Sequence, residues 1–488
     1  MQQEIEKIRL LLPKLFEEVN QEIYLNYSGQ KSEMNTSQIY SKYMHLANKD
    51  LILKLRDQKD KRIRYLAAFL EEMYMHLNTS KIRDKVSTIE SNTYIRYGEN
   101  TISYRIAPAI IANEHDREKR RALYMARIKA SYRINKFLYK QWLKFHEISK
   151  ELGYKNYLEY CSSINFKDYD QLESQALNFL SKTKSIYIDI MEEEFKKMSL
   201  DFHQSERHDL AFYFRAKEFD WIFPKEKMIQ VFESFTNNFG LSLKKYPNII
   251  IDDVIRENKT TRAFVSPIKI PEKIYLVITP KGGQDDYLSL FHESGHAFHF
   301  ANVNKETPME FKYLGPSSFT ETFAFLFEYL LLDEAFIKHY LKYDKRYLRF
   351  QYLYKLYFLR RYCSKLLYEI RLNSRKPDRH SSFEYKRIME NNMVTKHERA
   401  LYLSDIDPGM YTAEYLEAWF FEVQLKNFLR EKYGEDWFRK EEAGNFLKKI
   451  WSEGTRFLPT ELAREIGYKE INSSYIYEEI INSLEKYS

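Results

Sequence analysis

Glycine and proline are both scarce in this chain, and their scarcity limits the folds that it can form. The 488 residues include only 13 glycines and 12 prolines. Both residue types interrupt regular structure, so a chain that has few of them favours long helices joined by few turns. A chain of this length has room for about three domains of ordinary size, or for one large domain with lobes. The sequence therefore predicts a mainly α-helical protein with a sizeable core.

The composition excludes several other classes of protein. Apolar residues make up 44% and charged residues 30%, which is ordinary for a globular chain and unlike a disordered or collagenous one. Two cysteines, Cys161 and Cys363, cannot form a disulfide framework. The first residues lack the apolar core of a signal peptide, and the most apolar stretch, 323–332, is too short to span a bilayer. We expect a cytoplasmic protein with no membrane partner.

The net charge of +7 is concentrated in one block. Residues 345–387 contain 13 lysines and arginines against three acids, a net charge of +10. Such a block is compatible with nucleic-acid binding, with a positive wall beside a site for anionic ligands, or with a solvated helix face. The solvated face is the interpretation that we adopt, so no nucleic-acid partner is expected.

Hydrophobic periodicity divides the chain into a helical half and a half that combines helices with one small sheet. Apolar residues recur at intervals of three and four from residue 2 to about 78 and again from 116 to about 239. Alternating patterns predict a hairpin near 94–106 and short β-branched strands near 247–280. We therefore predict a helical N-terminal domain over 1–200 and a catalytic domain over 201–488.

A His-Glu-x-x-His motif lies in a predicted helix that begins near residue 285. Positions i and i+4 of a helix project from one face, so His292 and His296 can present two imidazoles to one zinc ion. Glu293 then lies beside the metal, where it can accept a proton from a zinc-activated water. The alternative is a buried helix with ordinary hydrogen-bonded histidines. The strand predicted at 274–279 could pair with an extended peptide.

A catalytic zinc usually takes a third protein ligand. The acids downstream of the motif are Glu306, Glu310, Glu321 and Glu328. Glu321 follows a Gly-Pro turn at the start of another predicted helix, which could return it to the histidines. Ser318 and Glu321 also have the spacing of a helix capping box, and the spacing alone does not decide between the two interpretations.

Several segments together resemble the thimet oligopeptidase/oligoendopeptidase F family of zinc peptidases. They are Arg262-Ala-Phe-Val-Ser-Pro267, Ile274-Tyr-Leu-Val-Ile-Thr-Pro280, Phe291-His-Glu-Ser-Gly-His-Ala-Phe-His299 and Gly315-Pro-Ser-Ser-Phe-Thr-Glu321. The resemblance implies that His292, His296 and Glu321 bind one zinc ion and that Glu293 is the general base. It also implies a two-lobed helical fold with a deep channel, one small sheet beside the zinc helix, and short unfolded oligopeptides as substrates.

The tyrosine-rich segment of that family resembles residues 409–415 here. Tyr411 and Tyr415 are therefore candidates for stabilising the oxyanion, although they could also be core residues of a helix. The family histidine that precedes these tyrosines is missing from 406–409, and the position of a third tyrosine is Ala418. These departures indicate a divergent branch. The alternative functions are a metallocarboxypeptidase and a non-enzymatic peptide-binding protein with a structural zinc, and the sequence does not indicate an oligomeric state.

Overall fold

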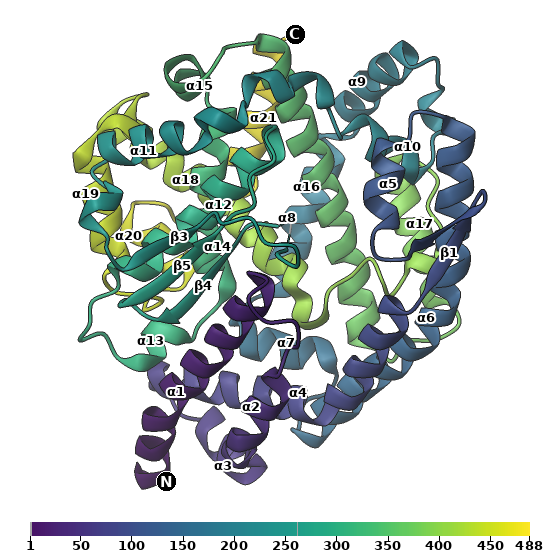
Figure 1. The fold of residues 1–488 in the computed structure, drawn as a ribbon. Coiled ribbons are helices and arrows are strands. Elements are labelled where there is room, and N and C mark those ends of the chain that lie inside the picture. Colours follow the sequence, from purple (N-terminus) through teal and green to yellow (C-terminus); the bar gives the residue numbers. More distant parts are fainter. Residues whose placement is uncertain (1, 261) are drawn as a thin grey trace. The chain divides into compact units, whose positions relative to one another are not determined.

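The computed structural model describes residues 2–260 and 262–488, and most of them are helical (Figure 1). This part of the chain forms 21 α-helices and two small β-sheets, so the predicted mainly α-helical fold is confirmed. The three longest helices are α6 (Arg117–Glu151), α4 (Lys61–Ser91) and α16 (Lys345–Ser374), and none of them contains glycine or proline. No helix among the described residues combines the length and apolarity needed to cross a membrane.

The chain divides into two compact units, each assembled from separate stretches of sequence. The first unit comprises Met1–Met73, Lys217–Tyr352 and Glu417–Ser488, and the second comprises Tyr74–Ala216 and Leu353–Leu416. This division differs from the single boundary near residue 200 that the sequence predicts. Three of the four unit boundaries fall inside continuous helices, α4, α16 and α18 (Tyr411–Tyr433), where the helical pattern gives no sign of a boundary, and the fourth lies between residues 216 and 217.

The first unit contains a three-stranded sheet, within the predicted range of 247–280. Its strands are β3 (Ile249–Asp252), β4 (Phe264–Lys269) and β5 (Lys273–Val277), in the order β3-β5-β4. β5 is parallel to β3 and antiparallel to β4. Both edges of β5 are therefore paired, and the expectation that residues 274–279 pair with a peptide is wrong. β4 is an edge strand of this sheet, and its outer edge is the one away from β5.

The rest of the first unit is mainly helical, and several helices lie wholly within it. They include α1 (Gln2–Tyr27), α2 (Thr36–Tyr43), α3 (Lys49–Arg56), α11 (Met228–Asn238), α12 (Gln284–Asn302), α13 (Met309–Tyr313), α14 (Ser317–Glu328), α15 (Glu334–Tyr340), α19 (Glu441–Trp451), α20 (Pro459–Glu465) and α21 (Ser474–Lys486).

The helix α1 packs on the sheet and runs beside β4 (Figure 1). Its apolar residues recur at intervals of three and four, and this stripe is buried, from Ile5 to Val19. Near its C-terminal end the ring of Tyr24 stacks on that of Tyr275, with the centroids 3.7 Å apart. The N-terminal helix is thus an integral part of the unit that holds the sheet.

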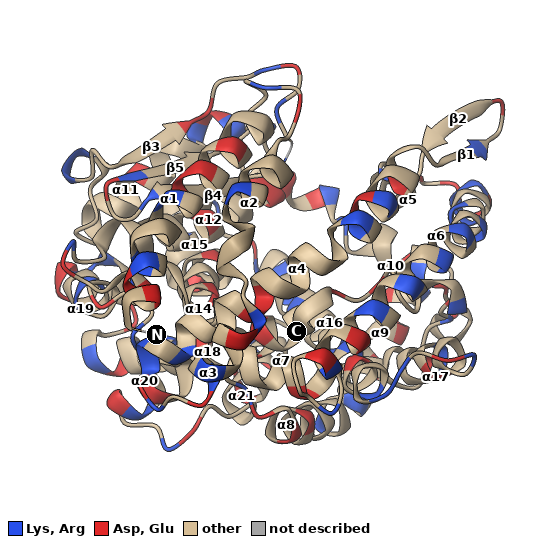
Figure 2. Cartoon of the chain, turned by 90° about the horizontal axis from the view of Figure 1, so that it is seen from below, with Lys and Arg blue, Asp and Glu red and all other residues tan. Residues whose placement is uncertain are grey.

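The second unit is helical apart from one hairpin, formed by β1 (Tyr94–Tyr97) and β2 (Asn100–Ser103). Lys and Arg recur along α6 in this unit (Figure 2). The helices that lie wholly in this unit are α5 (Ala107–Asn113), α6, α7 (Tyr157–Asn165), α8 (Tyr169–Lys182), α9 (Lys184–Lys197), α10 (Arg207–Tyr213) and α17 (Ser381–Met393).

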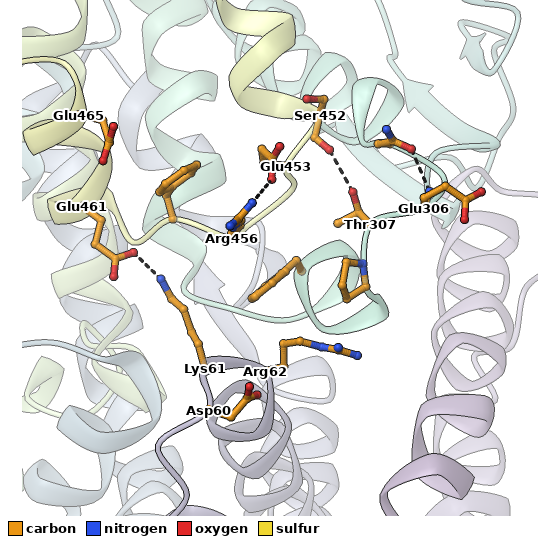
Figure 3. Close-up of a pocket in the computed structure, with 14 residues that line it drawn as sticks. Asp60, Lys61, Arg62, Glu306, Thr307, Ser452, Glu453, Arg456, Glu461 and Glu465 are labelled. Carbon is orange, nitrogen blue, oxygen red and sulfur yellow. Dashed lines mark hydrogen bonds and ion pairs between the residues drawn. The ribbon is translucent and has the colours of Figure 1, made fainter.

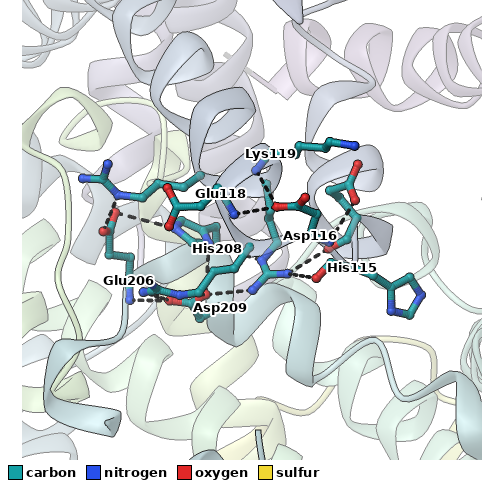
Figure 4. A network of polar contacts seen from close by, with 11 residues as sticks. His115, Asp116, Glu118, Lys119, Glu206, His208 and Asp209 are labelled. Atoms are coloured by element: carbon teal, nitrogen blue, oxygen red, sulfur yellow. Dashed lines mark hydrogen bonds and ion pairs between the residues drawn. The ribbon is translucent and has the colours of Figure 1, made fainter. Parts of the chain in front are cut away.

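A buried carboxylate joins α10 to the start of α6 in the second unit (Figure 4). Asp209 accepts hydrogen bonds of 2.9 Å from both Arg117 and Arg120. Burial opposes the charge of Asp209, but the bonds from His208 and the two arginines outweigh that effect and hold its pKa well below the usual value. Because the charges of Asp209, Arg117 and Arg120 are paired inside the unit, this network acts as a structural connection between helices.

Candidate metal centre

The His-Glu-x-x-His motif lies in the middle of α12, as the sequence predicts. Two glycines with positive φ, Gly282 and Gly283, precede this helix, and the Asp286 side chain accepts a 2.7 Å hydrogen bond from the Gly282 amide. The helix places the rings of His292 and His296 on one face, with their centroids 5.1 Å apart. The turn and the helix therefore present both imidazoles in the same direction.

The helix α14 packs closely against α12 because residue 295 is a glycine. A Cβ atom at Gly295 would lie 2.4 Å from the carbonyl oxygen of Phe323 and 2.6 Å from Cα of Ala324. Any larger residue would push the two helices apart. This close approach brings Glu321, in the second turn of α14, to the two histidines of α12.

The ligand atoms of His292, His296 and Glu321 all lie within 4.8 Å of one another. Oε2 of Glu321 is 3.4 Å from Nε2 of His292 and 3.7 Å from Nε2 of His296. Zinc binds nitrogen and oxygen ligands at about 2.1 Å in a tetrahedral arrangement, which separates neighbouring ligand atoms by about 3.4 Å. The donor set and its spacing therefore fit one zinc ion.

The alternative role of Glu321 in a capping box is wrong. The helix α14 begins at Ser317, with Pro316 at the N-cap, so Ser318 already lies inside the helix. The Ser318 hydroxyl instead donates a 2.6 Å hydrogen bond to Glu417. The N-cap of α14 lies two residues earlier than this capping box requires, and the Glu321 side chain is therefore free of the helix terminus.

The other acids considered as third ligands lie elsewhere. Glu310 is fully buried between two guanidinium groups, at 2.6 Å from Nε of Arg9 and 3.2 Å from Nε of Arg62. Glu306 is exposed in the loop after α12. His299, one turn beyond His296, packs against the rings of phenylalanines, and burial lowers its pKa to about 3. Its surroundings are those of a neutral core histidine.

Each histidine of the cluster has a second partner on α14. Nδ1 of His292 lies 2.8 Å from Oε2 of Glu328, and Nδ1 of His296 lies 2.8 Å from Oγ1 of Thr320. With Nδ1 engaged in this way, each ring directs Nε2 toward Glu321. Neither of these roles was predicted from the sequence. The sequence does carry a sign of the role of Glu328. This residue lies seven positions after Glu321, which places it two turns along the same helix face.

The three titratable groups of the motif differ in their surroundings. Burial opposes the charge of His292, but hydrogen bonds to Glu321 and Glu328 outweigh it and raise the pKa of His292 well above its usual value. Burial lowers the pKa of His296 to about 4. Burial also raises the pKa of Glu293 to about 7, although one of its oxygens accepts a 2.9 Å hydrogen bond from the Val265 amide of β4.

The two candidate tyrosines belong to the second unit. Tyr411 and Tyr415 lie in the first two turns of α18, and their rings meet edge to face with centroids 4.9 Å apart. The two therefore share a helix face, as their spacing predicts. The structure brings His292, Glu293, His296 and Glu321 together in the first unit, and the role of the tyrosines stays a prediction.

A cavity of about 810 Å³ lies apart from this cluster, between the start of α4, the loop after α12 and the segment before α20 (Figure 3). Figure 3 shows two ion pairs in its wall, Lys61 with Glu461 and Arg456 with Glu453. None of the cluster residues lines this cavity. We assign it no part in the proposed chemistry.

Comparisons with known proteins place the fold. Neither a family model nor a curated protein matches the sequence. A structure described as an oligoendopeptidase F matches 99% of this chain and 91% of its own, at 12% identity and a TM-score of 0.74. A second, from Bacillus anthracis strain Ames and also described as an oligoendopeptidase F, matches 98% of this chain and 82% of its own, at 14% identity and a TM-score of 0.62. A structure of PZ peptidase A with an inhibitor matches 100% of this chain and 86% of its own, at 16% identity and a TM-score of 0.63. The chain thus has the fold of these peptidases.

Proposed function

We propose that this protein is a zinc peptidase of the oligoendopeptidase F type, from a divergent branch, and that it hydrolyses short unfolded peptides. The convergence of His292, His296 and Glu321 within 4.8 Å, with Glu293 next to the first histidine, is the observation that carries the proposal. The fold shared with two oligoendopeptidase F structures and PZ peptidase A supports it.

The three proposed ligands would hold one zinc ion. A zinc ion in such a site polarises a peptide carbonyl and lowers the pKa of water towards 7, so that hydroxide is available near neutral pH. Two imidazoles and one carboxylate would leave a further coordination position open, which a catalytic site requires.

Glu293 moves the proton. As a carboxylate it takes the proton from the attacking water, and as a carboxylic acid it returns that proton to the leaving amine. Burial of this side chain raises its pKa from the usual value toward neutral pH, and a base and acid is most effective when its pKa lies near the working pH. The hydrogen bond from the Val265 amide holds one carboxylate oxygen in place.

A peptide substrate would lie along the outer edge of β4. Val265 faces Glu293 on that edge, and an extended peptide gains main-chain hydrogen bonds when it is added to an exposed strand. We infer that the peptide pairs with the beginning of β4 and thereby places its scissile bond beside Glu293.

The alternatives have less support. A carboxypeptidase would need a cation to hold the terminal carboxylate, and the basic block at 345–387 was the candidate. Within the second unit, cations of this block pair with acids of the chain, as Arg361 does with Asp405 and Lys365 with Asp407. A non-enzymatic protein with a structural zinc would have no need of a general base such as Glu293.

One experiment separates these functions. The purified protein is incubated with a mixed library of end-blocked peptides, with and without a chelator, and the products are read by mass spectrometry. We expect internal cleavage that the chelator abolishes and added zinc restores, and the Glu293→Gln variant should keep zinc and lose about 10²–10⁴-fold in turnover. Release of single C-terminal residues alone would favour a carboxypeptidase, and zinc without any cleavage would favour a binding protein.

A further inference from the structure

The helix α1 meets the edge of β4 directly beyond the point where that strand faces Glu293. The Val265 amide donates to Oε2 of Glu293 over 2.9 Å. Two residues further along, the Pro267 carbonyl accepts a 2.7 Å hydrogen bond from Nδ2 of Asn20 on α1. Residues two apart in a strand direct their backbone groups to the same edge. Two residues past Val265, the backbone carbonyl on this edge of β4 is therefore already hydrogen-bonded to α1.

Two features close this part of the edge to a peptide. Proline has no N–H, so Pro267 cannot donate to an added strand. Its carbonyl is already bonded to Asn20, and a second bond of 2.9 Å, from the Ser266 hydroxyl to the Asn20 carbonyl, fixes the helix against the strand. A peptide that continued past Val265 would find no ladder partner and would meet α1.

The helix is held firmly in this place. Besides the Tyr24–Tyr275 stack, the Tyr24 hydroxyl donates a 3.1 Å hydrogen bond to Asp252 at the end of β3. Further toward the N-terminus, the ring of Phe16 stacks on Tyr313 of α13, with the centroids 5.2 Å apart. Contacts on both sides of Asn20 thus oppose displacement of α1 by an incoming peptide.

We propose that Asn20 and Pro267 determine specificity by limiting the length of substrate on the N-terminal side of the scissile bond. This inference rests on the proposed peptidase function. Antiparallel pairing is the more stable arrangement per residue, and an antiparallel peptide runs toward its own N-terminus as β4 runs from Val265 to Pro267. The blocked stretch of the edge therefore faces residues that precede the scissile bond, and about two of them fit before the block.

A series of peptides with one fixed cleavage site tests this. One set is lengthened at the N-terminal flank and a matched set at the C-terminal flank. We expect kcat/KM to fall by at least about fivefold, the worth of a lost backbone hydrogen bond, once the N-terminal flank exceeds about two residues. The C-terminal set should show no such fall. Equal tolerance of both flanks, or a loss confined to the C-terminal set, would overturn the proposal.

Variants identify the residues responsible. Asn20→Ala removes the donor to the Pro267 carbonyl, and the added change Pro267→Ala returns an N–H to the edge of β4. In both the single and the double variant, the ratio of kcat/KM for peptides with long over short N-terminal flanks should rise at least about threefold. Lys14→Ala, an exposed position on the same helix, is the control and should leave the ratio unchanged. If the ratio is unchanged both in Asn20→Ala and in the double variant, the role given to these two residues is overturned. If the double variant does not fold, the result for Asn20→Ala alone tests the assignment.

Failure of the proposed function gives a different result. If the wild-type protein cleaves none of the peptides, it is not a peptidase of this kind, and the same series is then used for binding measurements on the zinc-loaded protein. Weaker binding of the long N-terminal flanks would still support the block by α1, whereas affinities independent of length would overturn it.

Discussion

Oε2 of Glu328 lies 2.8 Å from Nδ1 of His292, and the carboxylate thereby keeps a proton on Nδ1. An ionised carboxylate can only accept, so Nδ1 donates to it, and Nε2 is the nitrogen that a metal would use. His296 receives a neutral partner instead, the hydroxyl of Thr320. Both partners lie on α14 together with Glu321, so one helix orients two ligands and supplies the third.

Removal of the Glu328 carboxylate should weaken zinc binding without removing a ligand. Partners of this kind typically contribute 10–100-fold to metal affinity, so we expect Glu328→Ala to lose about that much, and Glu328→Gln less, since its amide oxygen still accepts from Nδ1. Competition with a chromophoric chelator measures the affinity directly, without reference to activity.

Two further variants calibrate that measurement. Glu321→Ala removes a proposed ligand and should lower the zinc content more than Glu328→Ala does. Glu306→Ala changes an exposed acid of the loop after α12 and should leave the affinity as it is. If Glu328→Ala binds zinc as tightly as the wild type while Glu321→Ala does not, the carboxylate has no orienting role.

The motif could be predicted from the sequence because it is local, whereas its supporting residues could not. His292 and His296 share a helix face whatever the rest of the chain does. Glu321 needed the packing of α14 on α12, and spacing alone could not distinguish a ligand from a capping residue. The roles of Glu328 and Thr320 depend on the rotation of α14 about its axis, which the close contact at Gly295 sets.

The order of the strands in the sheet could not be predicted from the sequence for a similar reason. The segments that form β4 and β5 are alike in pattern, and which of them is central depends on the parallel pairing of β5 with β3. That pairing joins residues separated by more than twenty positions. The packing of α1 on β4 is more distant still, so nothing in the periodicity of α1 showed that it would cover the strand edge.

Gly295→Ala should disturb both stability and metal binding. The added methyl would lie 2.4 Å from the carbonyl oxygen of Phe323, so the backbone of α12 or α14 has to move. Overpacking of this kind costs roughly 1–3 kcal/mol, and the displaced α14 would carry Glu321 away from the histidines. Thermal melts and zinc titrations measure the two effects.

The matched control for this change lies on the same helix. Ser289→Ala alters a half-buried position of α12, and we expect wild-type zinc affinity from it. A Gly295→Ala protein with the melting temperature and zinc affinity of the wild type would show that the two helices separate without consequence, against the role given to their close approach.

The second unit should lose stability as the pH falls from about 6.5 to about 4. Burial lowers the pKa of His146 from 6.5 to about 4, and His76 and His397, also in this unit, are lowered to about 4 as well. In this window the unfolded chain binds protons that the folded chain does not, so the free energy of unfolding decreases as the pH decreases. Each histidine can contribute on the order of 3 kcal/mol over the whole window.

Hydrogen exchange of the amides of α6 as a function of pH reports this loss. His146→Gln should reduce by about one the number of protons taken up on unfolding between pH 6.5 and 4, which flattens the dependence. An exposed histidine of the same unit, His203, provides the control, and His203→Gln should leave the slope unchanged. A slope in His146→Gln equal to that of the wild type would mean that this ring is protonated in the folded protein.

The last prediction concerns the two tyrosines at the start of α18. A phenol O–H is a good donor to a developing oxyanion, and the loss of one such donor typically costs 10²–10³-fold in kcat. A phenol that merely contacts the peptide backbone contributes to binding in the ground state and the transition state alike, so its loss raises KM and leaves kcat as it was. We expect one of Tyr411→Phe and Tyr415→Phe to lower kcat by the first mechanism. The chain has no histidine at 406–409 to share that role, so the effect should lie near the upper end of the range.

Because phenylalanine keeps the ring, and with it the edge-to-face contact of 4.9 Å, both variants should melt as the wild type does. Tyr132→Phe, which changes a half-exposed tyrosine of the same unit, is the control. If both variants retain wild-type kcat and KM, the two tyrosines are core residues of the helix, and the oxyanion is stabilised without them.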